Sequence, residues 1–233
     1  MFFYKEIQSS DPYAANVSLL LKGDGADGST SFVDSSGNNL TVVKNGAISI
    51  SNLQSKFGGT SIKVDNTGYL NIDNTSALQL GTGDYTIETW MYYAPSVSGY
   101  SFIFSLYNPN TGESSQLRFG DSGFGNRLQF NTGGGFNRVI GLMDGGTQYT
   151  KSSFENVWRH VAVVRNSGVV SVFVDGQQAS LYNSGPETGN FSMSHDLSAA
   201  VLLIGGAPSG YQFIGYLDDF RITKGVARYT ANF

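Results

Sequence analysis

Short runs of β-branched and aromatic residues alternate with turns rich in Gly, Asn and Asp along nearly the whole chain. The clearest case runs from Trp158 to Arg165, turns at residues 166–168, and continues from Val169 to an Asp175-Gly176 turn. This pattern indicates a β-hairpin. Such runs recur at roughly 8–15 residue intervals, as in all-β folds. We expect strands near Val17–Lys22, Leu40–Lys44, Ser61–Val64, Tyr69–Ile72, Tyr85–Tyr93, Ser101–Tyr107, Ser115–Phe119, Arg127–Asn131, Arg138–Leu142, Trp158–Arg165, Val169–Asp175, Val201–Gly205 and Phe213–Ile222.

Helical periodicity is nearly absent, and only Ser76–Leu80 and Gly225–Arg228 predict single helical turns. Within the strand Tyr85–Tyr93, alternation directs one apolar set to the core and a second set to the opposite face. The second set contains Thr86, Glu88, Trp90 and Tyr92. It forms either an aromatic platform or a face covered by a loop.

Strict alternation in the last strand places Asp218 on one face with Tyr216, Phe220 and Ile222, and Asp219 with Leu217 and Arg221. Both carboxylates then have apolar neighbours. A carboxylate in such surroundings needs a metal, a partner or backbone N–H groups.

The composition narrows the classes of function. The 233 residues show no composition shift, which predicts one large domain. The absence of Cys excludes a disulfide scaffold and Cys-based zinc sites. The net charge is only -4 and there is no basic patch, so nucleic-acid binding is not expected. No apolar run reaches the roughly 20 residues of a membrane span.

Residues 1–15 are predicted to form an arm ahead of the domain at 16–233. Phe2, Phe3, Tyr4 and Ile7 are apolar without a clear period, and Asp11-Pro12 then interrupts the chain. The arm is either an edge strand packed on the domain or a docking element for a neighbouring subunit. We do not expect the start to be a signal peptide, since its apolar run is short and no basic region precedes it. From Met1 and the end near Phe233 we expect a complete small gene product.

Several motifs in chain order resemble the laminin-G-like, concanavalin-A-like jelly roll that is often met in phage and bacterial surface proteins. They cover almost the whole chain: Leu19–Gly25, Phe32–Gly37, Ser55–Ile62, Gly83–Trp90, Trp158–Arg165, Val172–Gly176 and Phe213–Ile222. The resemblance implies an all-β sandwich of two stacked antiparallel sheets with six or seven strands each. It also implies that the first and last strands lie side by side.

The resemblance further implies a setting in a phage virion, as a head decoration, tail fibre or appendage protein made in the host cytoplasm. The expected function is non-enzymatic attachment, with other virion proteins and further copies of the chain as partners. The alternative is an adhesin that binds carbohydrate, including host surface glycans. No cofactor is required, although relatives often hold a structural Ca²⁺ through carboxylate oxygens. The matching positions are Asp24, Asp34 and Asp218, with backbone amides as the alternative partners of Asp218.

Aromatic side chains beside Asn and Gly in predicted loops are the candidates for sugar or protein contact. They are Tyr100, Tyr107, Phe124, Phe136, Tyr182 and Tyr211.

Catalytic motifs are incomplete. A glucanase of this fold needs clustered carboxylates, whereas Glu88 has Thr86 and Trp90 as its neighbours and is expected to be a hydrogen-bond anchor. The Gly23–Gly28 match to a nucleotide-binding fingerprint is not followed by a helix. Gly120–Gly123 resembles a protease nucleophile loop without a matching triad. His160 is expected to be structural.

Overall fold

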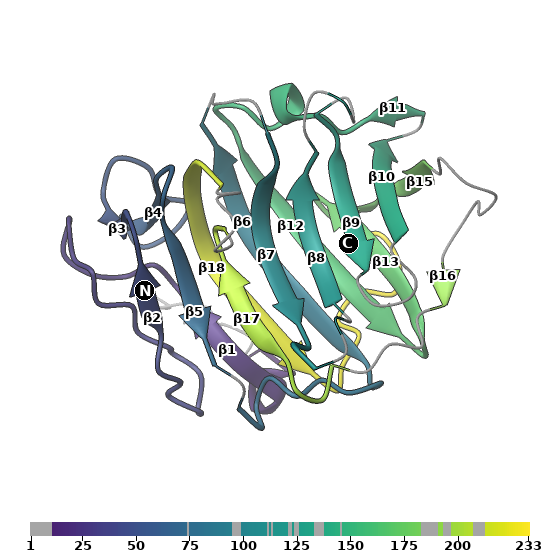
Figure 1. Ribbon diagram of the computed structural model, residues 1–233, viewed down its shortest axis with the longest axis horizontal. Coiled ribbons are helices and arrows are strands. Elements are labelled where there is room, and N and C mark those ends of the chain that lie inside the picture. The colour runs from purple at the N-terminus through teal and green to yellow at the C-terminus, as the bar shows by residue number, and fades with distance from the viewer. Residues whose placement is uncertain are drawn as a thin grey trace, which may run out of the picture.

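The computed structural model describes residues 11–73, 75–94, 99–110, 112, 114–120, 123, 126–132, 138–144, 146–182, 191–192, 197–206 and 213–233. These residues form two antiparallel sheets stacked face to face (Figure 1). Each sheet has nine strands in this part of the chain, more than the expected six or seven, because short edge strands extend both. No helix in the described residues is long and apolar enough to cross a membrane.

The first sheet, called sheet A, contains both ends of the domain. Its main order is β14-β13-β12-β6-β18-β4-β3, with β1 also paired to β18 and β16 to β13. The bounds are β1 Val17–Leu21, β3 Ile48–Ser51, β4 Ser61–Val64, β6 Tyr85–Tyr93, β12 Trp158–Asn166, β13 Val169–Val174, β14 Gln177–Gln178, β16 Phe191–Ser192 and β18 Gly215–Lys224.

The second sheet, called sheet B, lies in front of sheet A in Figure 1, and its strands β7 to β11 form a meander that β17, β5 and β2 extend. Its order is β11-β10-β9-β8-β7-β17-β5-β2, and β15 pairs with β10. The bounds are β2 Val43–Asn45, β5 Tyr69–Ile72, β7 Ser101–Tyr107, β8 Ser114–Phe119, β9 Leu128–Thr132, β10 Arg138–Asp144, β11 Thr147–Gln148, β15 Ser180–Tyr182 and β17 Val201–Ile204.

The predicted pairing of the first and last strands is confirmed, since β1 runs antiparallel to β18 with Leu21 opposite Phe220. The expected strict alternation in β18 is wrong. Asp219 adopts a left-handed backbone with φ 46° and forms a bulge, which adds one residue between the pairs of β18 with β6. Asp218 and Arg221 consequently both point to the outer face, while Leu217 and Phe220 are buried in the core.

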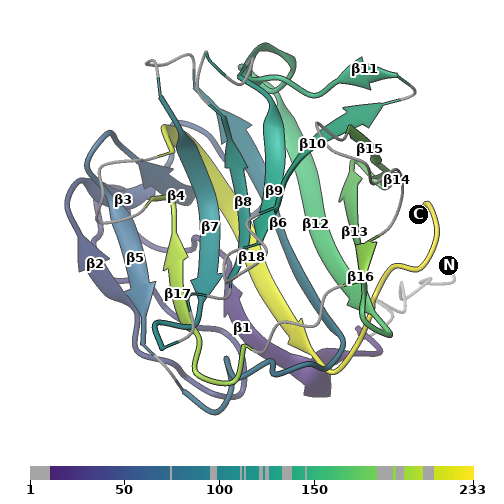
Figure 2. The same ribbon diagram turned by 45° about the vertical axis from the view of Figure 1, so that its right-hand side comes forward.

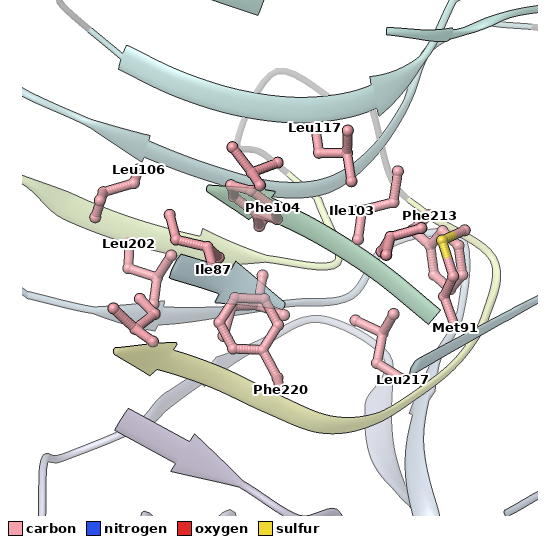
Figure 3. Packing of buried hydrophobic residues seen from close by; sticks show 14 of the residues in the cluster. Ile87, Met91, Ile103, Phe104, Leu106, Leu117, Leu202, Phe213, Leu217 and Phe220 are labelled. Carbon is pink, nitrogen blue, oxygen red and sulfur yellow. The ribbon is translucent and has the colours of Figure 1, made fainter. Parts of the chain in front are cut away.

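The core lies between the two sheets and is built from the alternate positions of their strands (Figure 3). Ile87 and Met91 of β6 are fully buried, as their side of the alternation predicted. Phe104 from sheet B meets Phe220 from sheet A edge to face, with ring centroids 5.9 Å apart. Such aromatic contacts add to the burial of apolar area as the main source of stability.

Both predicted helical turns are wrong. Ser76–Leu80 forms hydrogen-bonded turns instead, which bury Leu78 and Leu80 in the core. Gly225 ends β18 with φ 77°, and the chain then continues without a helix. The helices in the described residues are the short 3-10 turns η1 Ala14–Asn16 and η3 Lys151–Ser153. The strand expected at Leu40–Lys44 is shorter and later, and the strand β3 was not predicted.

A substitution at Gly215 would test how closely β18 packs against the neighbouring strand. Its φ is 147°, and a Cβ there would lie 2.0 Å from the carbonyl oxygen of Tyr92 in the neighbouring strand. We expect Gly215→Ala to lower the free energy of unfolding by about 3–5 kcal/mol, because strain and overpacking add. The matched control is Gly28→Ala, where φ is 78° but nothing lies within 4 Å, and we expect a loss of ~1–2 kcal/mol. Equal losses in urea denaturation would contradict this account.

Candidate functional site

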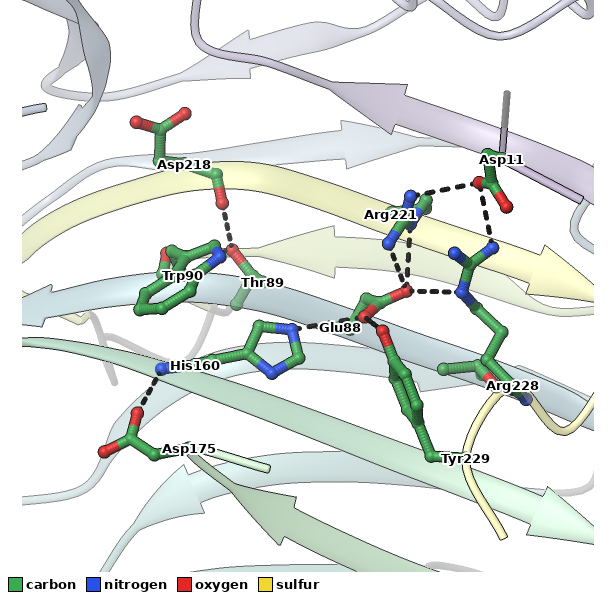
Figure 4. A network of polar contacts seen from close by, with 11 residues as sticks. Asp11, Glu88, Thr89, Trp90, His160, Asp175, Asp218, Arg221, Arg228 and Tyr229 are labelled. Carbon is green, nitrogen blue, oxygen red and sulfur yellow. Dashed lines mark hydrogen bonds and ion pairs between the residues drawn. The ribbon is translucent and has the colours of Figure 1, made fainter. Parts of the chain in front are cut away.

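Glu88 is the centre of a polar network on the outer face of sheet A (Figure 4). One carboxylate oxygen, Oε1, accepts bonds from Arg221 Nε at 2.8 Å and lies 3.2 Å from Arg228 Nε. The other, Oε2, accepts from Tyr229 Oη at 2.7 Å and lies 3.1 Å from His160 Nε2. An ionised carboxylate only accepts hydrogen bonds, so His160 Nε2 carries the proton. The expectations that Glu88 is an anchor and His160 structural agree with this geometry.

The surroundings of Glu88 keep it ionised. Its side chain is 2% exposed, and this desolvation alone would raise its pKa. The hydrogen bonds from His160 and Tyr229 and the charge of Arg221 outweigh that effect and hold the pKa at about 2. Burial and the Glu88 charge raise the pKa of Tyr229 to about 12. Neither group changes protonation near neutral pH, as a general acid or base would.

The same network joins the two ends of the described chain. Asp11 Oδ2 lies 3.2 Å from Arg221 Nη1 and 3.0 Å from Arg228 Nη1. Arg228 and Tyr229 belong to the C-terminal segment, residues 225–233, which crosses sheet A toward β13 (Figure 2). Tyr229 stacks on Phe233 with centroids 3.6 Å apart. This part of sheet A is therefore covered by the protein itself.

A loop covers the neighbouring part of sheet A. Residues 52–60 place Lys56 Nζ 3.8 Å from the centroid of the Trp90 ring, and Phe57 meets the same ring at 5.9 Å. The hypothesis of a covering loop thus holds for Trp90. Tyr92 instead contacts Trp158 at 5.7 Å and Tyr216 at 5.8 Å, and these three half-buried rings form an aromatic row across β12, β6 and β18.

The outer face of sheet B carries a different surface, which we call the amide belt. It consists of the polar side chains that alternate outward on three neighbouring strands, namely Ser105, Gln116, Arg118, Gln129 and Asn131. Asn131 Nδ2 donates to Gln116 Oε1 at 2.9 Å, and Arg118 Nε donates to Gln129 Oε1 at 3.4 Å. Asn131 Oδ1 has no hydrogen-bond partner within the described residues. Ser105 and Gln129 are only 3% exposed, so the accessible part of the belt consists of the half-buried Gln116, Arg118 and Asn131.

Aromatic side chains lie at both ends of this belt. Tyr100 and Phe102 stand beside Arg118, whose guanidinium carbon lies 4.7 Å from the Tyr100 centroid and 5.4 Å from that of Phe102. Tyr107 ends β7 at the other side and is half-buried. Two of the predicted ligand residues, Tyr100 and Tyr107, therefore flank one surface. Phe124, Phe136 and Tyr211 lie outside the described residues, as does the side chain of Tyr182, and these remain predictions.

Sequence reasoning missed the amide belt itself. The signal was available, because Gln116 and Arg118 are two residues apart in one predicted strand, and Gln129 and Asn131 are two apart in another. Each pair must point to one face. What the sequence lacked was the pairing of β8 with β9, which brings the two pairs together.

The three aspartates predicted to hold Ca²⁺ have different surroundings. Asp34 accepts hydrogen bonds from the amides of Leu20, Ser36 and Leu40 and from the Ser36 hydroxyl. Asp218 Oδ2 accepts from the amides of Lys56 and Phe57, as its alternative prediction held, while its Oδ1 has no described partner. Asp24 is exposed.

Within the described residues, no group of three or more His, Asp or Glu side chains could hold a metal ion. These aspartates do not form a shared calcium site, and the calcium expectation stays a prediction of the resemblance. Burial raises the pKa of Asp218 to about 6, against the effect of its two amide bonds.

Comparison with known proteins identifies the family. A family model described as the concanavalin A-like lectin/glucanases superfamily matches residues 64–228. The chain belongs to this superfamily. No match was found among curated proteins.

Solved structures agree with the lectin-like fold. The binding domain of Paraclostridial Mosquitocidal Protein 1 has 17% identity and a TM-score of 0.61, over 91% of this chain and 49% of that chain. Domain 4 of AbnA, a GH43 extracellular arabinanase from Geobacillus stearothermophilus in complex with arabinotriose, has 17% identity and a TM-score of 0.61, over 90% and 93%.

The binding domain of Botulinum neurotoxin DC in complex with rat synaptotagmin II has 16% identity and a TM-score of 0.60, over 92% of this chain and 49% of that chain. The chain thus spans about half the length of the two toxin domains. At these identities the likeness concerns the fold.

The superfamily includes glucanases, so we asked whether Glu88 could serve as a catalytic carboxyl group in glycoside hydrolysis. Glycoside hydrolysis needs two carboxyl groups on either side of the substrate, one of them with a raised pKa. Glu88 has a lowered pKa and is already bonded by Arg221, Tyr229 and His160. Its geometry fits a structural anchor.

The Glu88 network predicts a defined pH dependence. The pKa of Glu88 is depressed, so its contribution to stability is present above the ordinary value of 4.5 and disappears as pH falls toward about 2. The shift corresponds to about 3 kcal/mol. We expect Glu88→Gln to be less stable than wild type by about 3 kcal/mol at pH 7 and nearly equal to it at pH 2, in urea denaturation at both pH values.

The matched control is Glu155→Gln, which should change the free energy of unfolding by less than about 0.5 kcal/mol at either pH. A Glu88→Gln variant as stable as wild type at pH 7 would show that the network contributes nothing net, as some buried ion pairs do.

Asp34 tests the amide interpretation against calcium. Its buried carboxylate satisfies three backbone amides, so we expect Asp34→Ala to lose about 3 kcal/mol or more of unfolding free energy. Asp24→Ala should be nearly neutral because its side chain is exposed. The melting temperatures of wild type, Asp24→Ala and Asp34→Ala, measured by calorimetry, should fall in the same order with and without EDTA. A fall in the wild-type melting temperature with EDTA, absent in Asp24→Ala, would instead uphold the calcium prediction.

Proposed function

We propose that this chain is a non-enzymatic carbohydrate-binding module that holds an oligosaccharide along the amide belt of sheet B. The observation that carries the proposal is the belt itself, with amide and guanidinium groups between aromatic side chains at both ends of β7. Sugar hydroxyls need paired donors and acceptors, which Gln, Asn and Arg supply. Aromatic rings bind the apolar faces of sugars, and their phenol groups stay in water.

The dimensions of the belt favour a chain of sugars. Tyr100 directly precedes β7 and Tyr107 ends it, so their Cα atoms are separated by roughly 20 Å. Binding across that length engages several sugar residues. The domain of the arabinanase named above binds arabinotriose, which supports this class of ligand on this fold.

A second candidate is attachment to a protein in a surface assembly, the virion role expected from the sequence. The aromatic row of Tyr92, Trp158 and Tyr216 favours it, because Trp and Tyr dominate the energetic centres of protein interfaces. The toxin domain in complex with synaptotagmin II is a protein-binding example of the fold. The virion setting, the virion partners and the host glycans rest on the sequence resemblance.

Tyr107→Ala separates the two candidates. We expect it to weaken retention in affinity gel electrophoresis by roughly tenfold, because a stacked ring is lost. The gels would contain arabinan, pectin or β-glucan as probes. Tyr216→Ala is the matched control on sheet A and should migrate as wild type. Loss of retention in Tyr216→Ala alone would move the ligand to the aromatic row, and no retention of wild type on any of a broad glycan panel would overturn the proposal.

A further inference from the structure

The central strands of sheet B carry almost no charge. The neighbouring strands β9, β8, β7, β17 and β5 contain one charged residue among them, Arg118 on β8. Charged residues make up 14% of the whole chain, so this part of the sheet differs from the rest of the protein. The single cation belongs to the accessible part of the amide belt and lies beside Tyr100 at the start of β7.

Neutral groups position the guanidinium of Arg118. Its Nε donates to Gln129 Oε1 at 3.4 Å, and Gln129 is itself buried. The ring centroids of Tyr100 and Phe102 lie 4.7 and 5.4 Å from the guanidinium carbon. These contacts orient the planar group before a ligand arrives, so less conformational entropy is lost when it forms further hydrogen bonds.

An acidic sugar and a neutral sugar would interact differently with this guanidinium. Any ligand that lies along the belt removes water from Arg118. A sugar hydroxyl replaces that water with a neutral acceptor, whereas a carboxylate supplies the opposite charge and the stronger hydrogen bond. Two carboxylate oxygens also match the paired N–H donors of a planar guanidinium. Because Arg118 is half-buried, solvent and salt screen this attraction less than they would on a fully exposed side chain.

We infer that the amide belt takes an acidic oligosaccharide, with the carboxylate of a uronic acid residue bound by Arg118. The acidic sugar lies at the Tyr100 end of the belt. Gln116 and Asn131 then contact the hydroxyls of the next sugars toward Tyr107. The net charge of -4 disfavours general attraction of polyanions, so recognition depends on Arg118 itself. The inference rests on the proposed function, because it assigns the ligand class of the same site.

The test uses polygalacturonate and its methyl ester, which differ in the charge of the carboxyl group. In affinity gel electrophoresis of the whole chain with EDTA present, we expect the acid to bind at least roughly tenfold more tightly than the ester, as for a charge-assisted hydrogen bond. Added salt should weaken retention on the acid and leave retention on the ester unchanged. Dextran sulfate, an anion without carboxylates, should bind less tightly than polygalacturonate.

Three variants separate Arg118 from the overall charge. Arg118→Gln should bring the ratio of the two affinities toward one. Lys44→Gln, at an exposed residue of β2 in the same sheet, removes the same charge from the chain and should leave the ratio unchanged. Arg118→Lys keeps the charge without the planar fork and should give an intermediate ratio. Far-ultraviolet circular dichroism of each variant would show whether the fold is retained.

Failure of this inference differs from failure of the proposed function. Equal retention by polygalacturonate and its ester, weakened for both by Tyr107→Ala, would overturn the uronate assignment and leave the amide belt standing. Equal losses in Arg118→Gln and Lys44→Gln would reduce the effect to a general attraction of anions and overturn the assignment too, as would dextran sulfate binding as tightly as polygalacturonate. Absence of retention on every neutral and acidic glycan would instead overturn the proposed function.

Discussion

The buried carboxylate of Glu88 is the constraint on which the outer side of sheet A depends. A charge at 2% exposure is costly unless it is paired, and this one is paired by Arg221 and Arg228 and contacted by Tyr229 and His160. Arg221 lies on β18 and Arg228 in the C-terminal segment. Asp11, at the other end of the described chain, forms ion pairs with both guanidinium groups. A single charge thus fixes segments that are distant in sequence.

This arrangement assigns different tasks to the two outer faces. On sheet A, the C-terminal segment and the loop 52–60 cover Phe173 and Trp90, so most of the apolar surface is used within the protein. On sheet B, Gln116 and Asn131 pair with each other and remain half-buried. Hydrogen bonds between neutral amides exchange with a ligand's hydroxyls at a smaller cost than breaking an ion pair. A ligand face is therefore more easily built on sheet B.

The alternation of apolar and polar residues predicted the fold because each strand buries one of its two faces in the core. The positions of Ile87 and Met91 in the core followed from period two alone, and the pairing of β1 with β18 followed from the resemblance. The bulge at Asp219 did not follow, since one left-handed residue reverses every later side chain without a local sequence signal. The amide belt depends likewise on long-range pairing, and the role of Asp34 depends on three amides that only the folded loop brings together.

The low charged content gives these separate observations a common cause. Charged residues make up 14% of the chain, and several of them, such as Glu88, Arg221 and Arg228, pair with one another in the network. The remaining surface must then be kept in water by amides, hydroxyls and glycines. Each neutral polar group on such a surface contributes little binding free energy when it exchanges water for a ligand. Affinity therefore has to come from several simultaneous contacts along an extended ligand. The proposed recognition of carbohydrate accordingly depends on the length of the amide belt between Tyr100 and Tyr107 rather than on any single group on it.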